Sequence, residues 1–333
     1  MLDQKIVQQV KEIVDSRQRF LLQFHLNPDP DSVCSALAFA LVLKNLGKEV
    51  VVSRGDSALP DFLNILPGQD LVVDKSVSAI DLNNFEVFLI LDTSTIERMS
   101  AVKINFPASL KTVVIDHHIT NPKFGQINLL PDDYPATAQI LFELFHLCGW
   151  TITPDIAANL FLGLYTDTGG FRFRGTTSDT LAAASNLAQI YPDFPKLLFA
   201  LMNNNTPAAI LYEQSLLESL TVVGGGQVAL VGIDYASLRA KGITENDMHD
   251  GVASKLISVK DWQIGITLVE VEPGMVKVSL RSRDQDKYDV AKVAAVFGGG
   301  GHKAAAGARI AGAYPEAKQQ VVDAIHKIYP HLA

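Results

Sequence analysis

Aspartate and histidine residues stand at the ends of apolar segments in the first half of this chain. The triplet Asp116-His117-His118 directly follows the apolar run 112–115. Three further apolar segments carry the same residue types at or just past their ends: His25, Asp29 and Asp31 at 20–31, Asp92 after 87–91, and Asp167 after a stretch that ends at Tyr165. Open α/β sheets bind ligands beyond the carboxyl ends of their strands. Four such segments in one chain therefore predict a polynuclear metal site at one edge of a sheet.

The predicted ligand atoms are carboxylate oxygens and imidazole nitrogens, without a thiolate. Such a set suits Mn²⁺ or Mg²⁺, and Zn²⁺ and Fe²⁺ are alternatives. Asp29 and Asp31 are two residues apart in a proline-rich segment, so they can face two neighbouring ions, and Asp92 can bridge them. Two ions roughly 4 Å apart activate water and bind a phosphoryl oxygen, so hydrolysis at phosphorus is the predicted chemistry.

Each of these residues alone has a simpler explanation. An aspartate after a strand is usually part of a turn or the cap of a helix. His25 alone is compatible with a hydrogen-bonded histidine of the core. The metal hypothesis depends on the joint occurrence of all six residues just past apolar elements.

Composition limits the classes of protein that fit. A chain of 333 residues with 48% hydrophobic residues predicts two domains with cores of their own. The net charge of −8 argues against binding of long nucleic acid, so a phosphate-bearing ligand must be captured locally. The apolar runs are too short to cross a membrane, and the first residues do not resemble a signal peptide. Cys34 and Cys148 lie in apolar helical patterns, which predicts free thiols and a cytoplasmic protein.

The order of elements predicts the architecture of the first domain. Strand patterns at 20–26, 48–53, 87–91 and 112–115 alternate with helical patterns, which lie at 31–46, 135–148, 154–165 and 178–190. This alternation is typical of an α/β fold with a doubly wound, mostly parallel sheet. Asp31 or Ser32 is expected to cap the first of these helices, and Thr137 is expected to have only a structural role at the start of the second.

The pattern changes after a break near 193–207. A hairpin is expected around Pro273-Gly274, and a smaller α+β domain is predicted for this half. The predicted organisation is a domain at 1–190, a linker at 191–215 and a domain at 216–333, with an active-site cleft between the two domains.

A second candidate site is the glycine run 298–301 with His302 behind it. Successive glycines can present backbone N–H groups to an anion, although a bare glycine run is also typical of a flexible turn. Between 281 and 309 six basic residues stand against three acidic ones, which makes a local cationic patch on an acidic protein. The patch predicts a clamp for a non-scissile phosphate or a terminal nucleotide. Arg172 and Arg174 are further candidates for phosphate contact, and solvated strand charges explain them equally well.

Several segments resemble the motifs of a known family. Segments 25–32, 91–94, 116–118 and 165–171 are similar to the four motifs of the DHH phosphoesterase superfamily. Segment 298–307 resembles the signature of the DHH-associated C-terminal domain. Together the segments cover essentially the whole chain in order. The length resembles that of the NrnA-like subgroup, which comprises cytosolic oligoribonucleases that also act as phosphatases on 3′-phosphoadenosine 5′-phosphate.

The resemblance implies roles for single residues. A first ion is expected at His25, Asp29 and Asp92. A second ion is expected at Asp31, Asp92, His117 and Asp167. The implied catalytic residues are Asp92, Asp116, His117 and His118, with His118 near the scissile phosphate and Asp116 behind the histidine pair. The expected substrate contacts are Arg281, Ser282, Gly299, Gly300, Gly301 and His302.

We therefore expect a two-metal phosphoesterase, with Mn²⁺ as the first metal to test, that hydrolyses short oligoribonucleotides to mononucleotides, 3′-phosphoadenosine 5′-phosphate to AMP, or both. A linear or cyclic dinucleotide phosphodiesterase is the alternative. An inorganic polyphosphatase is disfavoured because a different C-terminal domain accompanies that activity. A nucleotide sensor without activity is disfavoured because all six ligand positions are filled. The sequence leaves the choice between a monomer and a homodimer open.

Overall fold

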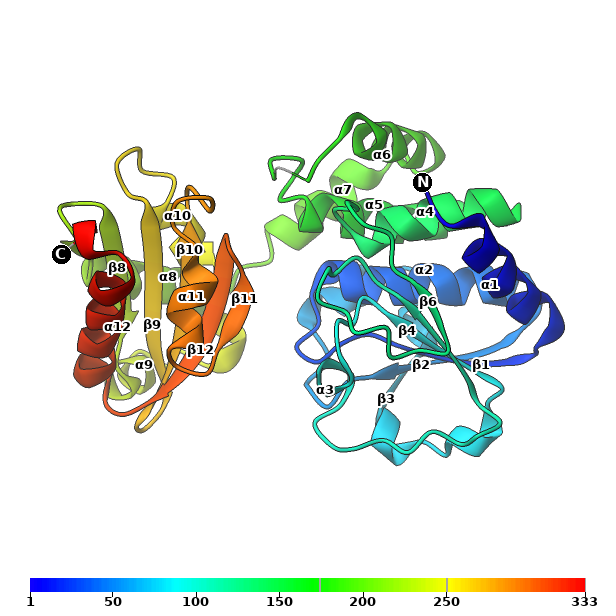
Figure 1. The fold of residues 1–333 in the computed structure, drawn as a ribbon, viewed down its shortest axis with the longest axis horizontal. Coiled ribbons are helices and arrows are strands. Elements are labelled where there is room, and N and C mark those ends of the chain that lie inside the picture. Colours follow the sequence, from blue (N-terminus) through cyan, green and yellow to red (C-terminus); the bar gives the residue numbers. More distant parts are fainter. Residues whose placement is uncertain (174, 250, 333) are drawn as a thin grey trace. The chain divides into compact units, whose positions relative to one another are not determined.

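The computed structural model describes residues 1–173, 175–249 and 251–332, so Arg174 lies outside the described residues. The chain forms two compact units, Met1–Asn203 and Asn204–Ala333 (Figure 1). The segment predicted as a linker contains α7 (Phe194–Met202) and the start of α8 (Pro207–Glu218). No helix among the described residues is both long and apolar enough to cross a membrane.

The first unit is built on a sheet of six parallel strands, in the order β3-β2-β1-β4-β5-β6. The strands are β1 (Arg19–Gln23), β2 (Glu49–Arg54), β3 (Val72–Ser76), β4 (Val87–Leu91), β5 (Lys111–Ile115) and β6 (Ile127–Leu129). The order reverses between β1 and β4, which lie side by side although two other strands separate them in the sequence. Ligands bind at such a switch point in open α/β sheets. The predicted parallel sheet is confirmed.

Both faces of this sheet are covered, which explains why the central strand β4 is entirely apolar and buried. Phe20 and Leu22 of β1 pack into the core beneath the main helices, whereas Leu21 packs into a smaller core on the opposite face. The main helices lie together on one side of the sheet in Figure 1. They are α1 (Gln4–Ser16), α2 (Pro30–Asn45), α4 (Thr137–Cys148), α5 (Pro154–Asp167) and α6 (Ser178–Ile190). The other face carries α3 (Ile96–Met99) and 3₁₀ turns, among them Val77–Ala79 and Leu82–Asn84.

The start of α2 differs from the prediction. Asp29 is its N-cap and accepts a hydrogen bond from the Ser32 N–H at 3.0 Å, so the expectation that Asp31 or Ser32 caps the helix is wrong. Pro30 is the first helical residue, where its missing N–H is not needed and its fixed φ suits the helix. Asp31 therefore lies inside the first turn, and its carboxylate is available for contacts outside its own helix.

The second unit has a mixed sheet in the order β11-β12-β10-β9-β8-β7, in which only β8 and β9 are parallel. Its strands are β7 (Thr221–Val223), β8 (Val228–Ile233), β9 (Ile264–Glu272), β10 (Met275–Ser282), β11 (Gly300–His302) and β12 (Ala305–Ala311). One face packs on α11 (Val290–Ala295) and α12 (Tyr314–Ile328), and the other on α8, α9 (Tyr235–Ala240) and α10 (Gly251–Leu256). The smaller α+β fold and the hairpin at Pro273-Gly274 are confirmed.

Candidate functional site

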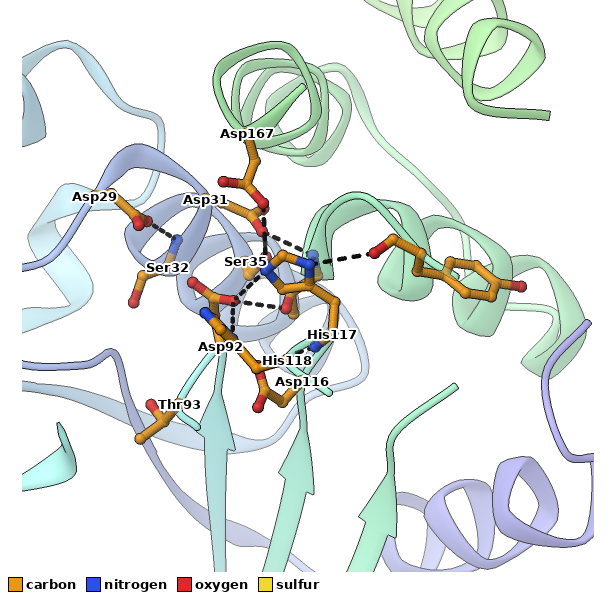
Figure 2. A network of polar contacts seen from close by, with 12 residues as sticks. Asp29, Asp31, Ser32, Ser35, Asp92, Thr93, Asp116, His117, His118 and Asp167 are labelled. Carbon is orange, nitrogen blue, oxygen red and sulfur yellow. Dashed lines mark hydrogen bonds and ion pairs between the residues drawn. The ribbon is translucent and has the colours of Figure 1, made fainter. Parts of the chain in front are cut away.

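The six predicted metal ligands meet at the carboxyl edge of the first sheet, around the switch point, and Figure 2 shows five of them: Asp29, Asp31, Asp92, His117 and Asp167. They come from the β1–α2 connection, from the first turn of α2, from the residues after β4 and β5, and from the last residue of α5. Among the described residues there are three groups whose donor atoms lie within 4.8 Å of one another inside the group: His25, Asp29 and Asp92; Asp31, His117 and Asp167; and Asp92, His117 and His118. The first two groups correspond to the two ligand sets that the resemblance implies, with one difference. Asp92 was expected in both sets but is grouped only with the first, and its Oδ1 lies 3.4 Å from His117 Nε2 of the second.

His25 is oriented so that one ring nitrogen faces the carboxylates. Its Nδ1 lies 2.8 Å from the carbonyl oxygen of Leu26, so a proton on Nδ1 can be donated there. Its Nε2 lies 3.4 Å from Asp29 Oδ2 and 3.7 Å from Asp92 Oδ2. The hydrogen bond at Nδ1 favours the tautomer with a lone pair on Nε2, which is the form that binds a metal.

His117 has the same arrangement. Its Nδ1 lies 3.2 Å from the carbonyl oxygen of Tyr134, which can accept the Nδ1 proton. Its Nε2 lies 3.4 Å from Asp92 Oδ1 and 3.2 Å from Asp167 Oδ2, so the ring stands between the two carboxylates in Figure 2. Sequence reasoning could not find Tyr134, because it acts through its backbone and any residue type has a carbonyl group.

Asp116 lies behind the histidines and does not face the other carboxylates. It is fully buried, and its Oδ1 accepts hydrogen bonds from the His117 N–H at 2.9 Å and from His118 Nδ1 at 2.7 Å. Its Oδ2 accepts a hydrogen bond from Asn121 Nδ2 at 2.7 Å, and the same amide donates to the Thr93 carbonyl oxygen at 3.1 Å. These bonds determine the orientation of the His118 ring. Asn121 was not among the residues singled out from the sequence.

Asp92 has an unusual backbone conformation. Its φ is +50°, in the left-handed region that few residues other than glycine, asparagine and aspartate adopt. The Asp92 N–H donates to the Ile115 carbonyl oxygen at 2.9 Å, so the end of β4 stays paired with β5 up to this residue. The turn directs the buried side chain to the point where both histidines converge.

Comparison with known proteins agrees with this geometry. The N-terminal domain of the DHH family matches residues 19–164, and the DHHA1 domain matches residues 229–329. The bifunctional oligoribonuclease and PAP phosphatase NrnA of Thermus thermophilus is 31% identical over 304 residues, which cover 91% of this chain and 88% of that protein. The chain belongs to the DHH family. The resemblance seen in the sequence is thereby confirmed.

Two other proteins similar to this DHH-family chain extend the comparison. The bifunctional oligoribonuclease and PAP phosphatase NrnA of Bacillus subtilis is 25% identical over 299 residues, which cover 87% of this chain and 88% of that protein. The crystal structure of an exopolyphosphatase-related protein from Bacteroides fragilis has a TM-score of 0.91 at 24% identity and covers 100% of this chain and 98% of that one. That likeness shows that the fold is shared.

The buried carboxylates of the DHH-family site disfavour one another's charge. Burial, followed by the charge of Asp92, raises the pKa of Asp31 well above its usual range. Burial and the charge of Asp92 likewise raise the pKa of Asp167 well above its usual range. For Asp92 itself, burial and the charge of Asp29 raise the pKa. Divalent cations at this position would relieve the repulsion, and the donor atoms are oxygen and imidazole nitrogen, so the residues present fit such ions.

The pKa values of two imidazoles are raised as well, which favours their charged form, whereas the raised pKa values of the aspartates favour their neutral form. Burial acts to lower the pKa of His25, but the hydrogen bond and charge of Asp29 together with Asp92 raise it overall. Burial also acts to lower the pKa of His118, but the hydrogen bond to Asp116 and the charges of the surrounding aspartates raise it to about 9. In the absence of a metal ion, bound protons therefore supply positive charge to this cluster.

This electrostatic arrangement predicts a pH-dependent stabilisation by metal. A carboxyl whose pKa is raised on folding contributes stability below its unfolded pKa, and that contribution is lost as the pH rises through the raised value. The metal-free first unit should therefore be strained at neutral pH, and Mn²⁺ should raise its Tm by about 5 °C or more at pH 7.5. The rise should shrink at pH 5.5, because protons then compete for the same atoms.

Thermal unfolding followed by circular dichroism, with excess Mn²⁺ or with EDTA at each pH, measures this difference. The difference between the two curves at one pH cancels metal-independent effects of pH on the rest of the chain. An equal rise in Tm at pH 5.5 and pH 7.5 would contradict binding of the ion by these carboxylates and imidazoles.

The candidate substrate contacts lie in the second unit, at the end of the interior strand β10 and in or just before the edge strand β11. Ala305 of β12 pairs with Arg281 of β10 on one side and with His302 of β11 on the other. Residues opposite each other in an antiparallel pair project from the same face, so Arg281 and His302 share a face, with backbones about 10 Å apart. Ser282 alternates to the opposite face. It is buried, and its Oγ has no hydrogen-bond partner among the described residues.

The glycine run does more than form a turn. Residues Gly300–His302 form the edge strand β11, which was not predicted from the sequence. A Cβ at Gly299 would lie 2.2 Å from the Gly307 carbonyl oxygen, and a Cβ at Gly301 would lie 2.5 Å from the Ala305 carbonyl oxygen. Gly301 also has φ +141°. Glycine is therefore required for the close approach of β11 to β12, whatever else these residues bind.

Proposed function

We propose that this DHH-family protein is a metal-dependent phosphoesterase that hydrolyses short oligoribonucleotides to mononucleotides, 3′-phosphoadenosine 5′-phosphate to AMP, or both. The observation that carries the chemistry is the position of Asp92, whose two carboxylate oxygens face different histidines, His25 and His117. The substrate class is supported by the relatives that are named as bifunctional oligoribonucleases and PAP phosphatases.

In this proposal, two divalent ions share Asp92. His25 and Asp29 hold the first, and Asp31, His117 and Asp167 hold the second. Such a pair supplies a water activated at neutral pH and a positive charge that polarises the phosphoryl oxygen. Mn²⁺ is the first candidate, because a mixed set of carboxylates and imidazoles suits it well.

His118 and Asp116 complete the proposed catalytic group. Asp116 holds the His118 ring through Nδ1, so the ring is oriented before substrate binds. The pKa of about 9 keeps the metal-free imidazole protonated at neutral pH. A protonated His118 can donate a hydrogen bond to a phosphoryl oxygen as negative charge builds up there, or a proton to the leaving oxygen.

The second unit is proposed to bind the part of the substrate that does not react. Arg281 and His302 present a cationic and an imidazole side chain on one face of the sheet, and Gly299 and Gly301 allow the edge strand with His302 to lie close to β12. Ser282 stays a predicted contact, but its buried hydroxyl, which has no hydrogen-bond partner among the described residues, lies on the face opposite Arg281 and His302.

The proposal extends to the protein's surroundings. Cys34 and Cys148 are buried free thiols, which supports a reducing compartment such as the cytoplasm. The net charge of −8 supports short ligands as partners in preference to long nucleic acid.

A panel of substrates with Mn²⁺ tests the function and its preference for short chains. We expect a ribodinucleotide and a pentanucleotide to be cleaved faster than a 24-mer, because a confined patch holds one or two phosphates but cannot follow a long backbone. 3′-Phosphoadenosine 5′-phosphate should yield AMP. Cyclic dinucleotides test the alternative phosphodiesterase, and pyrophosphate tests the polyphosphatase. Products are separated by chromatography, and faster cleavage of the 24-mer than of the dinucleotide would reject the length preference.

A further inference from the structure

The first turn of α4 contacts two of the carboxylates in the candidate metal site. The Thr137 N–H donates to Asp31 Oδ2 at 2.7 Å, and the Ala138 N–H donates to Asp31 Oδ1 at 3.0 Å. The Thr137 hydroxyl donates to Asp92 Oδ1 at 2.9 Å. Thr137 is fully buried. One residue outside the predicted ligand set thus binds a carboxylate from each of two different motifs.

The helix and the carboxylate depend on each other. The N-cap of α4 is Ala136, which has no side chain that could accept the first N–H groups. Asp31, from a helix more than 100 residues earlier in the chain, accepts them in its place. Both of its oxygens are bonded to consecutive amides, and the positive end of the helix dipole favours their charge. Asp31 is therefore fixed in orientation independently of any ion.

The contact with Asp92 restricts a torsion that is otherwise soft. The last torsion of an aspartate side chain has a broad, shallow preference, so a free carboxylate turns easily about it. Here Oδ1 lies 3.4 Å from His117 Nε2, while Oδ2 lies 3.7 Å from His25 Nε2. Because the Thr137 hydroxyl holds Oδ1, it keeps one oxygen directed to each histidine. A carboxylate shared by two ions requires this division.

We propose that Thr137 is a positioning residue for the metal centre: its hydroxyl fixes the plane of the shared Asp92, while its amide fixes Asp31, so that both ion positions are formed before any ion binds. The inference rests on the proposed metal centre and extends it to the start of α4. The role of the hydroxyl is separate from capping the helix, because the N-terminus of α4 has no side-chain cap and the Thr137 hydroxyl donates to Asp92 instead.

Three variants separate positioning from stability. Thr137→Val has the same shape and retains the amide but loses the hydroxyl, whereas Thr137→Ser retains the hydroxyl. Thr180→Val is the matched control, because Thr180 is equally buried and donates its hydroxyl to Gln139 Oε1 at 2.8 Å, away from the carboxylates. Mn²⁺ affinity and stoichiometry are measured by isothermal titration calorimetry, and the Tm of each protein is measured in EDTA.

We expect Thr137→Val to weaken Mn²⁺ binding by about 10- to 100-fold, the range typical of residues that orient metal ligands. Thr137→Ser should stay within about threefold of the wild type, a difference of less than about 0.7 kcal/mol. Thr180→Val should lower the Tm and leave the affinity unchanged. On bis-p-nitrophenyl phosphate at saturating Mn²⁺, Thr137→Val should lower kcat more than it raises KM.

Several outcomes would overturn the inference. Wild-type Mn²⁺ affinity in Thr137→Val, or equal losses in the valine and serine variants, would leave Thr137 with a structural role only. An equal loss in Thr180→Val would have the same meaning. If Thr137→Val fails to fold, Thr137→Ala gives the same comparison with serine. Failure of the wild type to bind Mn²⁺ would reject the proposed metal centre itself, which is a different result.

Discussion

Replacement of Asp92 by asparagine is expected to lower kcat on bis-p-nitrophenyl phosphate by at least about 10³-fold, since a metal centre supplies several kcal/mol of stabilisation to the transition state. Asparagine has nearly the same shape as aspartate and tolerates the left-handed backbone found here at φ +50°. The change therefore removes one negative charge from the carboxylate that the two proposed ions would share, and it leaves the turn after β4 intact. Alanine at this position would add backbone strain to the loss of the ligand.

Metal content distinguishes loss of the shared ligand from loss of the fold. Elemental analysis after gel filtration should give fewer ions per chain in Asp92→Asn than in the wild type. The Tm in EDTA should not fall, because removal of a buried carboxylate also removes repulsion within the cluster. Two tightly bound ions together with a wild-type rate would reject the shared position of Asp92.

Replacement of Arg281 by alanine is expected to raise KM on a ribodinucleotide by roughly 10- to 150-fold, equivalent to about 1.5–3 kcal/mol for a hydrogen bond to a charged group. The physical reason is that the proposed contact is remote from the reacting phosphorus, so its loss weakens binding of substrate and transition state alike. On bis-p-nitrophenyl phosphate, which has no second nucleotide, the effect should be far smaller. Metal content should not change.

Arg309→Ala provides a matched control for this variant. Arg309 lies on β12 four residues beyond Ala305, the residue that pairs with Arg281, so it is on the same face but about 13 Å further along the strand. It should have little effect on either substrate. Equal losses in Arg281→Ala on the dinucleotide and on bis-p-nitrophenyl phosphate would assign Arg281 to the chemistry or to the fold.

The sequence could predict those parts of the site that depend on residues close to one another in the chain. Val87–Leu91 is entirely apolar and ends directly before Asp92, and Lys111–Ile115 ends directly before the Asp116-His117-His118 triplet, so strand, strand end and site residues could all be located from neighbouring residues. A parallel sheet then brings such ends together at one edge. In the second unit, the hairpin at Pro273-Gly274 and its two strands could be predicted because they too are marked by neighbouring residues.

The remaining features depend on contacts between distant segments or on competition between neighbours. The start of α2 is one example. Because the fixed φ of Pro30 suits the first helical position, the cap is Asp29 and not Asp31. A strand at Gly300–His302 is hard to predict because glycine is unfavourable in strands, yet the close approach to β12 excludes other residues at Gly299 and Gly301. The bonds from Thr137 to Asp31 and Asp92 leave no periodic signal, because they join residues far apart in the sequence.

The distance along the chain between the ligands has a consequence for how the first unit folds. His25 and Asp167 lie near opposite ends of the segment that builds the site, and the strands between them pair in parallel, which requires long loops to close before contacts form. Neither of the two proposed ion positions lies within a short piece of the chain, because the first joins His25 to Asp92 and the second joins Asp31 to Asp167. A cation can therefore bind only once the sheet has assembled, so we expect it to slow unfolding while leaving the rate of folding almost unchanged.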